Sequence, residues 1–227
     1  MREKFLSQME TLNRSLVEMG TMVEESINNT IRAMNEHNMD IATRNIEADK
    51  DIDQKMRVIE SLCIKLFLRQ QPVASDLRMV SAALKMVSDL ERIGDQSSSI
   101  CELLLTLSPE CDIASVPHIG EMATAVKKMV KNCVSSFVNQ DLDVAYRVID
   151  SDDVVDVLFS EAKKFMMEKI RQEDIGDYAL DLMMIAKYLE RIGDHTVNVS
   201  QWIIFASTGE KNGVNYLTSE EDKMDDK

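Results

Sequence analysis

Apolar side chains recur at alternating steps of three and four residues in the first part of the chain. The stripe consists of Phe5, Met9, Leu12, Leu16, Met19, Val23, Ile27, Ile31 and Met34. This spacing places all of them on one face of an α-helix. It therefore predicts one long helix that buries a single face.

Two further helices are predicted in the first half of the chain. One runs over about 39–72, where Asn38 or Asp40 is available as a cap and Pro72 ends the pattern. The other runs over about 75–107. Three helices joined by short turns are enough to bury three apolar stripes against one another, so we expect a three-helix bundle.

The same pattern returns after a linker bracketed by Pro109 and Pro117, with helices predicted over about 118–138, 141–172 and 177–206. Individual residues repeat as well. Asp40 to Ile46 matches Asp143 to Ile149, and Leu90-Glu-Arg-Ile-Gly-Asp95 recurs letter for letter at Leu189 to Asp194. The fold class we predict is all-α, with two tandem antiparallel three-helix bundles that arose by internal duplication. We expect the bundles at 1–108 and 109–206 and an acidic flexible tail at 207–227.

Composition agrees with long helices, because only 7 glycines and 3 prolines are available for tight turns. The formal net charge of −14 opposes binding to phosphate backbones, so we expect no nucleic-acid partner. No apolar run approaches the length of a transmembrane segment, and no signal core follows the first residues. We therefore expect a cytoplasmic protein.

The repeated hexapeptide carries two carboxylates four residues apart, Glu91 and Asp95 in the first copy and Glu190 and Asp194 in the second. Residues four apart share a helix face, so each pair concentrates negative charge. Each pair also continues the apolar stripe of its own helix, which places it at the edge of the core. Bare charge at such a position is costly without a partner.

A second acidic pair occurs near the start of the middle helix in each copy. These residues are Asp49 and Asp53 in the first copy and Asp152 and Asp156 in the second. If the two helices meet, each copy gathers four carboxylates, and oxygen-only clusters suit hard divalent cations such as magnesium, or iron and manganese. A glycine, Gly94 or Gly193, stands beside the carboxylates in both copies, as expected where another group approaches closely.

The alternative interpretation is a set of surface carboxylates paired with arginine. Arg92 and Arg191 are available, but each lies about 100 degrees around the helix from its neighbouring glutamate, so we expect them to pair with another helix. His195 follows Asp194 and faces a different direction, so we expect it to line the bundle or face solvent.

Taken together, these residues resemble the PhoU family of phosphate-specific transport system accessory proteins. The resemblance rests on Pro72-Val-Ala-Ser-Asp-Leu-Arg78, on Asp-Leu-Glu-Arg-Ile-Gly-Asp at 89–95 and on the repeat at 189–195, and it spans about residues 3–206. It implies a non-enzymatic negative regulator of phosphate uptake and of the phosphate-starvation response. It also implies two partners, the ATPase subunit of the phosphate ABC transporter and a sensor histidine kinase.

The resemblance further implies metal ions, iron or zinc in some family members, bound at the acidic motifs. A homodimer is expected because Met-rich amphipathic bundles often self-associate. Two other functions remain open from the sequence: a carboxylate-bridged metalloenzyme, in which paired cations act on a phosphoryl group, and a metal or phosphate store.

Overall fold

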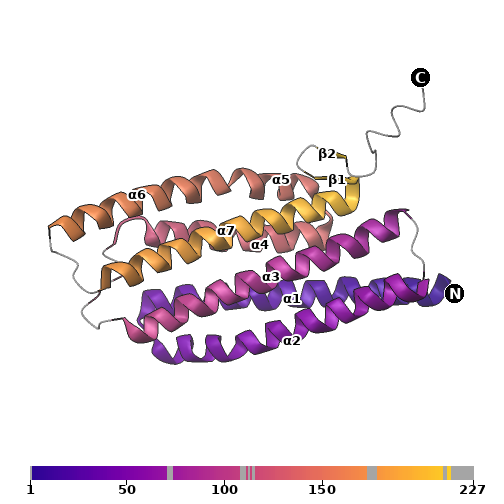
Figure 1. The fold of residues 1–227 in the computed structure, drawn as a ribbon, viewed down its shortest axis with the longest axis horizontal. Coiled ribbons are helices and arrows are strands. Elements are labelled where there is room, and N and C mark those ends of the chain that lie inside the picture. Colours follow the sequence, from indigo (N-terminus) through magenta and orange to yellow (C-terminus); the bar gives the residue numbers. More distant parts are fainter. Residues whose placement is uncertain are drawn as a thin grey trace, which may run out of the picture.

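The computed structural model describes residues 2–70, 74–107, 111, 113, 116–172, 178–211 and 214–215. The elements are α1 (Arg2–Glu36), α2 (Met39–Gln70), α3 (Ala74–Thr106), α4 (Ile119–Asn139), α5 (Leu142–Asp150), α6 (Asp152–Arg171), α7 (Ala179–Thr208), β1 (Glu210–Lys211) and β2 (Val214–Asn215). Figure 1 shows the helices as long, roughly parallel rods in two bundles. The all-α fold class and the tandem three-helix bundles are confirmed.

The first bundle consists of α1, α2 and α3, each of which contacts the other two. The stripe predicted on α1 faces the core, since Leu12, Met19 and Val23 have no exposed surface. Asn38 provides the cap of α2, because its side-chain oxygen accepts a hydrogen bond from the Ile41 amide at 3.1 Å. The expected end of this helix at Pro72 lies outside the described residues.

The second bundle contains α4 and α7, with α5 and α6 together in the place of α2. The prediction of one helix over 141–172 is wrong in this respect, because the helix is interrupted at Ser151. Ser151 keeps backbone angles of the α region (φ −74°, ψ −14°), and its hydroxyl donates to the Arg147 carbonyl at 2.6 Å, so the break is confined to one residue. The interruption leaves Asp152 as the first residue of α6.

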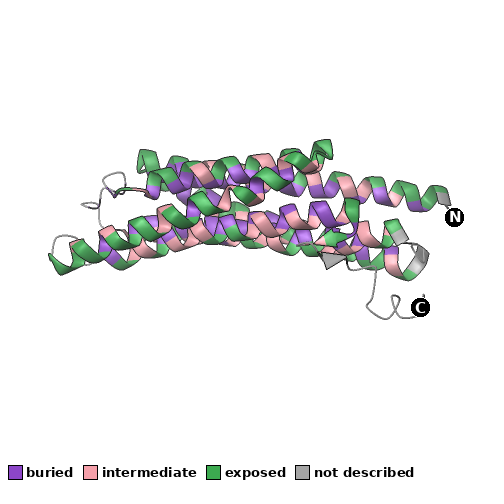
Figure 2. Cartoon of the chain, turned by 90° about the horizontal axis from the view of Figure 1, so that it is seen from above, coloured by how far each residue is buried: buried purple, intermediate pink, exposed green. Residues whose placement is uncertain are grey.

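The two bundles pack side by side, mainly through α3 against α7 and also through α1 against α4. Figure 1 shows α3 and α7 adjacent in the middle of the molecule, and Figure 2 shows buried residues concentrated on the faces that the helices turn toward one another. A Cβ at Gly20 on α1 would lie 3.2 Å from Val134 on α4, so the helices approach closely there. Both repeated acidic segments thus lie on the helices that join the repeats.

Regular structure continues in the described residues beyond position 207, where the tail is expected to begin. Helix α7 ends at Thr208, where Gly209 has a φ of 83° that suits glycine, and β1 and β2 then form an antiparallel pair. Lys211 Nζ of β1 lies 3.5 Å from the centroid of the Trp202 ring on α7. This cation–π contact holds the strand pair against α7. The remainder of the expected tail lies outside the described residues, as does Pro109 of the expected linker.

No helix within the described part of the chain has the length and apolar composition that a bilayer crossing requires.

Candidate metal centres

The acidic residues of the first repeat converge where α2 packs against α3. One carboxylate oxygen from each of Asp53, Glu91 and Asp95 lies within 4.8 Å of the other two. Oxygens that share one divalent cation at 2.0 to 2.6 Å are separated by at most about 4 to 5 Å. The three side chains are half-buried and are spaced closely enough to bind one ion together.

Asp49 is the fourth carboxylate of this cluster and lies beside Gly94. A Cβ at Gly94 would come within 3.1 Å of Asp49 Oδ1, so the glycine leaves space for this carboxylate against α3. Burial raises the pKa of Asp49 to about 6, and the negative charges of Asp95 and Asp53 act in the same direction. The two acidic pairs of the first repeat therefore form one electrostatic unit, which we call the first cluster (Asp49, Asp53, Glu91 and Asp95).

Burial also raises the pKa of Glu91 and Asp95. Asp95 is the next cause for Glu91, because two like charges on one helix face disfavour ionisation of both. Arg92 opposes this effect at both residues. Ionisation of the first cluster is therefore unfavourable overall, because the charge of Arg92 only partly offsets burial and mutual repulsion.

Among the described residues, Arg92 pairs with carboxylates of its own helix, so the expectation that it pairs with another helix is wrong. Its Nη1 donates to Asp95 Oδ2 at 3.2 Å, and its Nε lies 3.6 Å from Glu91 Oε2. A long side chain can fold back along its own helix, although its Cβ points elsewhere. The Arg92 side chain is 57% exposed, so it can move into solvent without disturbing the core.

The second cluster consists of Asp152 and Asp156 on α6 with Glu190 and Asp194 on α7. Burial raises the pKa of Asp152 to about 6, with Asp194 and Asp156 as the next causes. A Cβ at Gly193 would lie 2.9 Å from Asp152 Oδ1, which repeats the arrangement at Gly94. In each copy, therefore, a glycine leaves space for the first aspartate of the middle helix, and that aspartate is electrostatically coupled to the other carboxylates of its cluster.

The second cluster differs from the first in carrying a lysine. Burial and the charge of Glu190 raise the pKa of Asp194, and Lys187, whose Nζ lies 2.6 Å from Glu190 Oε1, opposes this rise. The corresponding residue in the first repeat is Ser88. Arg191, by contrast, is exposed and pairs with none of the carboxylates that the structure describes. The two clusters are thus similar in position and different in charge balance.

His195 has a structural role that the sequence did not reveal. Its Nδ1 lies 2.9 Å from Asp89 Oδ1 on α3, and Asn198 donates to the same oxygen at 3.3 Å. His195 therefore lies between the clusters and joins the repeats. We expected a residue that lines the bundle or faces solvent; the contact with Asp89 could not be read from the sequence, because the two residues are 106 positions apart.

The donor set determines what the clusters can do chemically. Carboxylate oxygens favour hard cations such as Mg²⁺, Mn²⁺ and iron, and a bound cation would relieve the repulsion that raises the pKa values. Zinc is also bound by carboxylates, although it favours histidine and cysteine. Among the described residues, only Asp53, Glu91 and Asp95 bring three ligand oxygens within 4.8 Å of one another, whereas Asp156 and Asp194 of the second cluster are exposed. The residues present therefore fit a cation site in the first repeat, and the second cluster is a more open version of the same arrangement.

The chain is thus a duplicated helical bundle. Each repeat carries one carboxylate cluster, and part of each cluster lies on α3 or α7, the helices that join the repeats. These features define a class of tandem-repeat helical proteins with a candidate cation site. The PhoU domain matches residues 16–104 and 119–203, one match per bundle. The chain belongs to the PhoU domain family.

Similar proteins match over nearly their whole length. The phosphate-specific transport system accessory protein PhoU homolog of Clostridium acetobutylicum is 35% identical over 217 residues, which cover 94% of this chain and 99% of that protein. The homolog from Aquifex aeolicus is 35% identical over 208 residues, covering 91% and 94%. The crystal structure of PhoU from Pseudomonas aeruginosa has a TM-score of 0.84 at 29% identity and covers 91% of this chain and 100% of that one.

Proposed function

We propose that this chain is a negative regulator of phosphate uptake and of the phosphate-starvation response. The observation that carries the proposal is the match to proteins named phosphate-specific transport system accessory proteins, which extends over 94% of this chain and 99% of one relative. An alignment of that extent includes both repeats and both acidic segments. The proposed activity is therefore that of the whole chain.

The proposed mode of action is that of a cytoplasmic adaptor. One surface would bind the ATPase subunit of a phosphate ABC transporter, and another would bind a sensor histidine kinase. The formal charge of −14 favours basic partner surfaces and disfavours nucleic acid. A homodimer would present both surfaces twice.

The two clusters are proposed as cation sites within this adaptor, with iron, manganese, magnesium or zinc as the ion. Their carboxylates come from different helices, with Asp49 and Asp53 on α2 and Glu91 and Asp95 on α3. A cation bound by both pairs would hold α2 against α3, and its counterpart would hold α6 against α7. Occupancy would therefore change the rigidity of both bundles, which an adaptor can transmit to a partner.

Co-purification tests the adaptor role. The tagged full-length chain is expected to retain the transporter ATPase and the sensor kinase from membranes solubilised after growth in ample phosphate, and to retain less of the kinase after phosphate starvation. Loss of the chain should raise expression of a phosphate-starvation reporter in ample phosphate. Failure to retain either partner in both conditions would contradict the adaptor role.

Cation binding is tested separately by calorimetric titration of Mn²⁺ and Fe²⁺ into chelator-treated protein. The paired variant Glu91→Gln with Glu190→Gln should bind at least about tenfold more weakly, because each cluster loses one charged ligand. The same preparations should be assayed for phosphate release from phosphate esters. Manganese-dependent turnover that the paired variant abolishes would support a metalloenzyme in place of an adaptor.

A further inference from the structure

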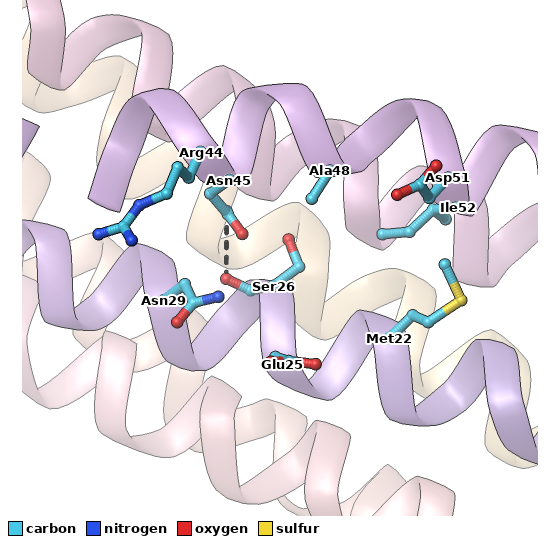
Figure 3. A pocket seen from close by; sticks show the side chains of 9 residues that line it. All are labelled: Met22, Glu25, Ser26, Asn29, Arg44, Asn45, Ala48, Asp51 and Ile52. Atoms are coloured by element: carbon cyan, nitrogen blue, oxygen red, sulfur yellow. Dashed lines mark hydrogen bonds between the residues drawn. The ribbon is translucent and has the colours of Figure 1, made fainter. Parts of the chain in front are cut away.

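A pocket of about 340 Å³ lies between α1 and α2 of the first repeat, on a side that the carboxylate clusters do not use. Its inner wall carries Ser26 and Asn45, and its outer wall carries Glu25 and Asp51 (Figure 3). Asn45 is only 2% exposed, whereas Glu25 and Asp51 are exposed. The pocket therefore runs from an acidic rim to a buried amide.

The orientation of the Asn45 amide is set by its partners. Nδ2 donates to the Ser26 carbonyl at 3.2 Å and to Thr30 Oγ1 at 2.9 Å. Because a carbonyl can only accept, the amide nitrogen must be the atom that faces Ser26. Asn45 Oδ1 is then the remaining polar atom of the amide, and no described residue donates a hydrogen bond to it. A buried acceptor without a donor is unfavourable and marks a place where a donor can bind.

The second repeat shows that the fold does not require this polar wall. Thr30 Oγ1 donates to the Ser97 carbonyl at 3.3 Å, and Cys133 Sγ donates to the corresponding Thr196 carbonyl at 3.8 Å, so Thr30 and Cys133 are equivalent. The domain matches begin at residues 16 and 119, with the same offset. By that offset Ser26 corresponds to Met129 and Asn45 to Val148, both of which are buried.

The same comparison applies to the rim. Glu25 and Asp51 of the first repeat correspond to Lys128 and Val154 of the second, so both carboxylates are replaced. Arg44, at the other end of the pocket in Figure 3, corresponds to Arg147 and is retained. The features specific to the first repeat are therefore a buried acceptor and two carboxylates at the rim, and all of them favour a positively charged hydrogen-bond donor.

We propose that this pocket binds a small aliphatic ammonium group, carried by a polyamine or by a free amino acid. The ammonium donates to Asn45 Oδ1 and is balanced by Glu25 and Asp51, while its alkyl chain lies against Met22 and Ile52, which also line the pocket. In an amino acid, the carboxylate would face Arg44. The site is separate from the carboxylate clusters and adds a small-molecule input to the proposed regulator.

Access to Asn45 requires only side-chain movement. Met22 and Arg44 line the same pocket, and both have several rotatable bonds. The Arg44 Nε donates to the Asp40 carbonyl at 3.1 Å along its own helix, which leaves the outer guanidinium nitrogens available. Rotation of these side chains admits an alkylammonium without separating α1 from α2.

Three probes with the same four-carbon chain test the proposal: n-butylamine, putrescine and 4-aminobutyrate, with butane-1,4-diol as the neutral control. Each is titrated at millimolar concentrations into the full-length chain, and the NMR signals of the Asn45 side-chain amide and of the Met22 and Ile52 methyl groups are followed. At least one amine should shift all of these signals saturably. Putrescine binding more tightly than 4-aminobutyrate identifies a polyamine, and the reverse identifies an amino acid.

Substitutions taken from the second repeat provide matched variants. Ser26→Met, Thr30→Cys and Asn45→Val together install the apolar wall of repeat two, and the unfolding temperature is measured to establish that the variant folds. Glu25→Lys with Asp51→Val changes only exposed rim positions, so it tests the proposal even if the wall variant does not fold. Both should weaken amine binding by at least about tenfold. Absence of shifts with every amine, equal binding of the diol, or unchanged binding in the rim variant would overturn the proposal.

Discussion

His195 on α7 is joined to Asp89 on α3, with 2.9 Å between His195 Nδ1 and Asp89 Oδ1. Asn198, one turn further along α7, donates to the same oxygen. The contact crosses the interface between the repeats next to both acidic segments. It therefore fixes the register of α3 relative to α7 near His195, the residue that lies beside both clusters.

Replacement of Asp89 by alanine should destabilise the chain. The His195 and Asn198 side chains would lose their acceptor in a region where Asp89 is only 17% exposed and His195 only 19%. Loss of a charge-assisted hydrogen bond at such a site typically costs about 1 to 2 kcal/mol. Urea denaturation should show this decrease in the free energy of unfolding, while Glu168→Ala, on the exposed face of α6, changes it by less than about 0.5 kcal/mol. Equal midpoints for the two variants would show that the bridge contributes little.

The two glycines beside the clusters should be required for cation binding more than for folding. A Cβ at Gly193 would lie 2.9 Å from Asp152 Oδ1, so Gly193→Ala has to displace that carboxylate. Alanine is at the same time favoured in a helix by about 1 kcal/mol, which offsets the collision in the free energy of unfolding. We expect near-normal stability with Mn²⁺ affinity at the second cluster reduced about tenfold, as measured by calorimetry.

Gly120 on α4 provides the matched control, since a Cβ there would meet no atom within 4 Å. Gly120→Ala should stabilise the chain by about 0.5 kcal/mol and leave Mn²⁺ affinity unchanged. A loss of affinity in Gly120→Ala equal to that in Gly193→Ala would show that the effect does not arise from the Asp152 contact.

The crowded carboxylates should make the cation-free chain less stable as the pH rises. The pKa of Asp49 and of Asp152 is raised to about 6 in the folded chain, against about 3.9 in an unfolded one. Between these values the folded chain binds more protons than the unfolded chain, so the free energy of unfolding falls with increasing pH. The stabilisation from these two groups is complete below about pH 4 and is lost above about pH 6.

Asparagine at both positions mimics the protonated state and should remove this dependence. In EDTA at pH 7, Asp49→Asn with Asp152→Asn should be more stable than the original chain by about 1 to 2 kcal/mol after allowance for solvent screening. The difference should disappear near pH 4 and reverse at pH 7 when Mn²⁺ is added, because the variant lacks two ligands. If the variant is less stable than the original chain in EDTA at pH 7, ionisation of Asp49 and Asp152 does not destabilise the folded chain.

Local pattern was sufficient to predict most of the helices and the meeting of Asp53 with Glu91 and Asp95 in the first repeat. The stripe on α1 is buried because its period matches the helix, and Glu91 and Asp95 meet Asp53 because their phase places them at the α2–α3 boundary. These properties depend on the residues of a single helix and on the requirement that apolar faces meet.

The remaining features depend on neighbours that are distant in the sequence or on side-chain rotamers. The break between α5 and α6 is confined to Ser151, whose backbone stays in the α region, so the periodicity of apolar residues gives no sign of it. The return of Arg92 onto its own helix is a choice among rotamers that the spacing of residues leaves open. The His195 contact requires the docking of one repeat on the other, which local pattern does not specify.

Lys187 should make the second cluster the weaker cation site. Its ammonium lies 2.6 Å from Glu190 Oε1 and so competes with any cation for that carboxylate, whereas the first repeat has Ser88 at this position. Lys187→Ser should therefore tighten Mn²⁺ binding at the second cluster by about fivefold, the effect of removing a competing ion pair worth about 1 kcal/mol. Calorimetry in a Glu91→Gln background, in which the first cluster is impaired, isolates this site.

The exchange can be made in the other direction, because Ser88 is exposed and its hydroxyl donates to the Leu84 carbonyl of its own helix. Ser88→Lys, measured in a Glu190→Gln background, should weaken Mn²⁺ binding at the first cluster by a similar factor. If the affinities follow the lysine in both exchanges, charge balance sets the difference between the repeats. A different result is also informative: Lys187→Ser leaves the second site unchanged, while Ser88→Lys weakens the first. The difference between the repeats would then arise from the position of Asp152 after the break at Ser151, which neither substitution alters.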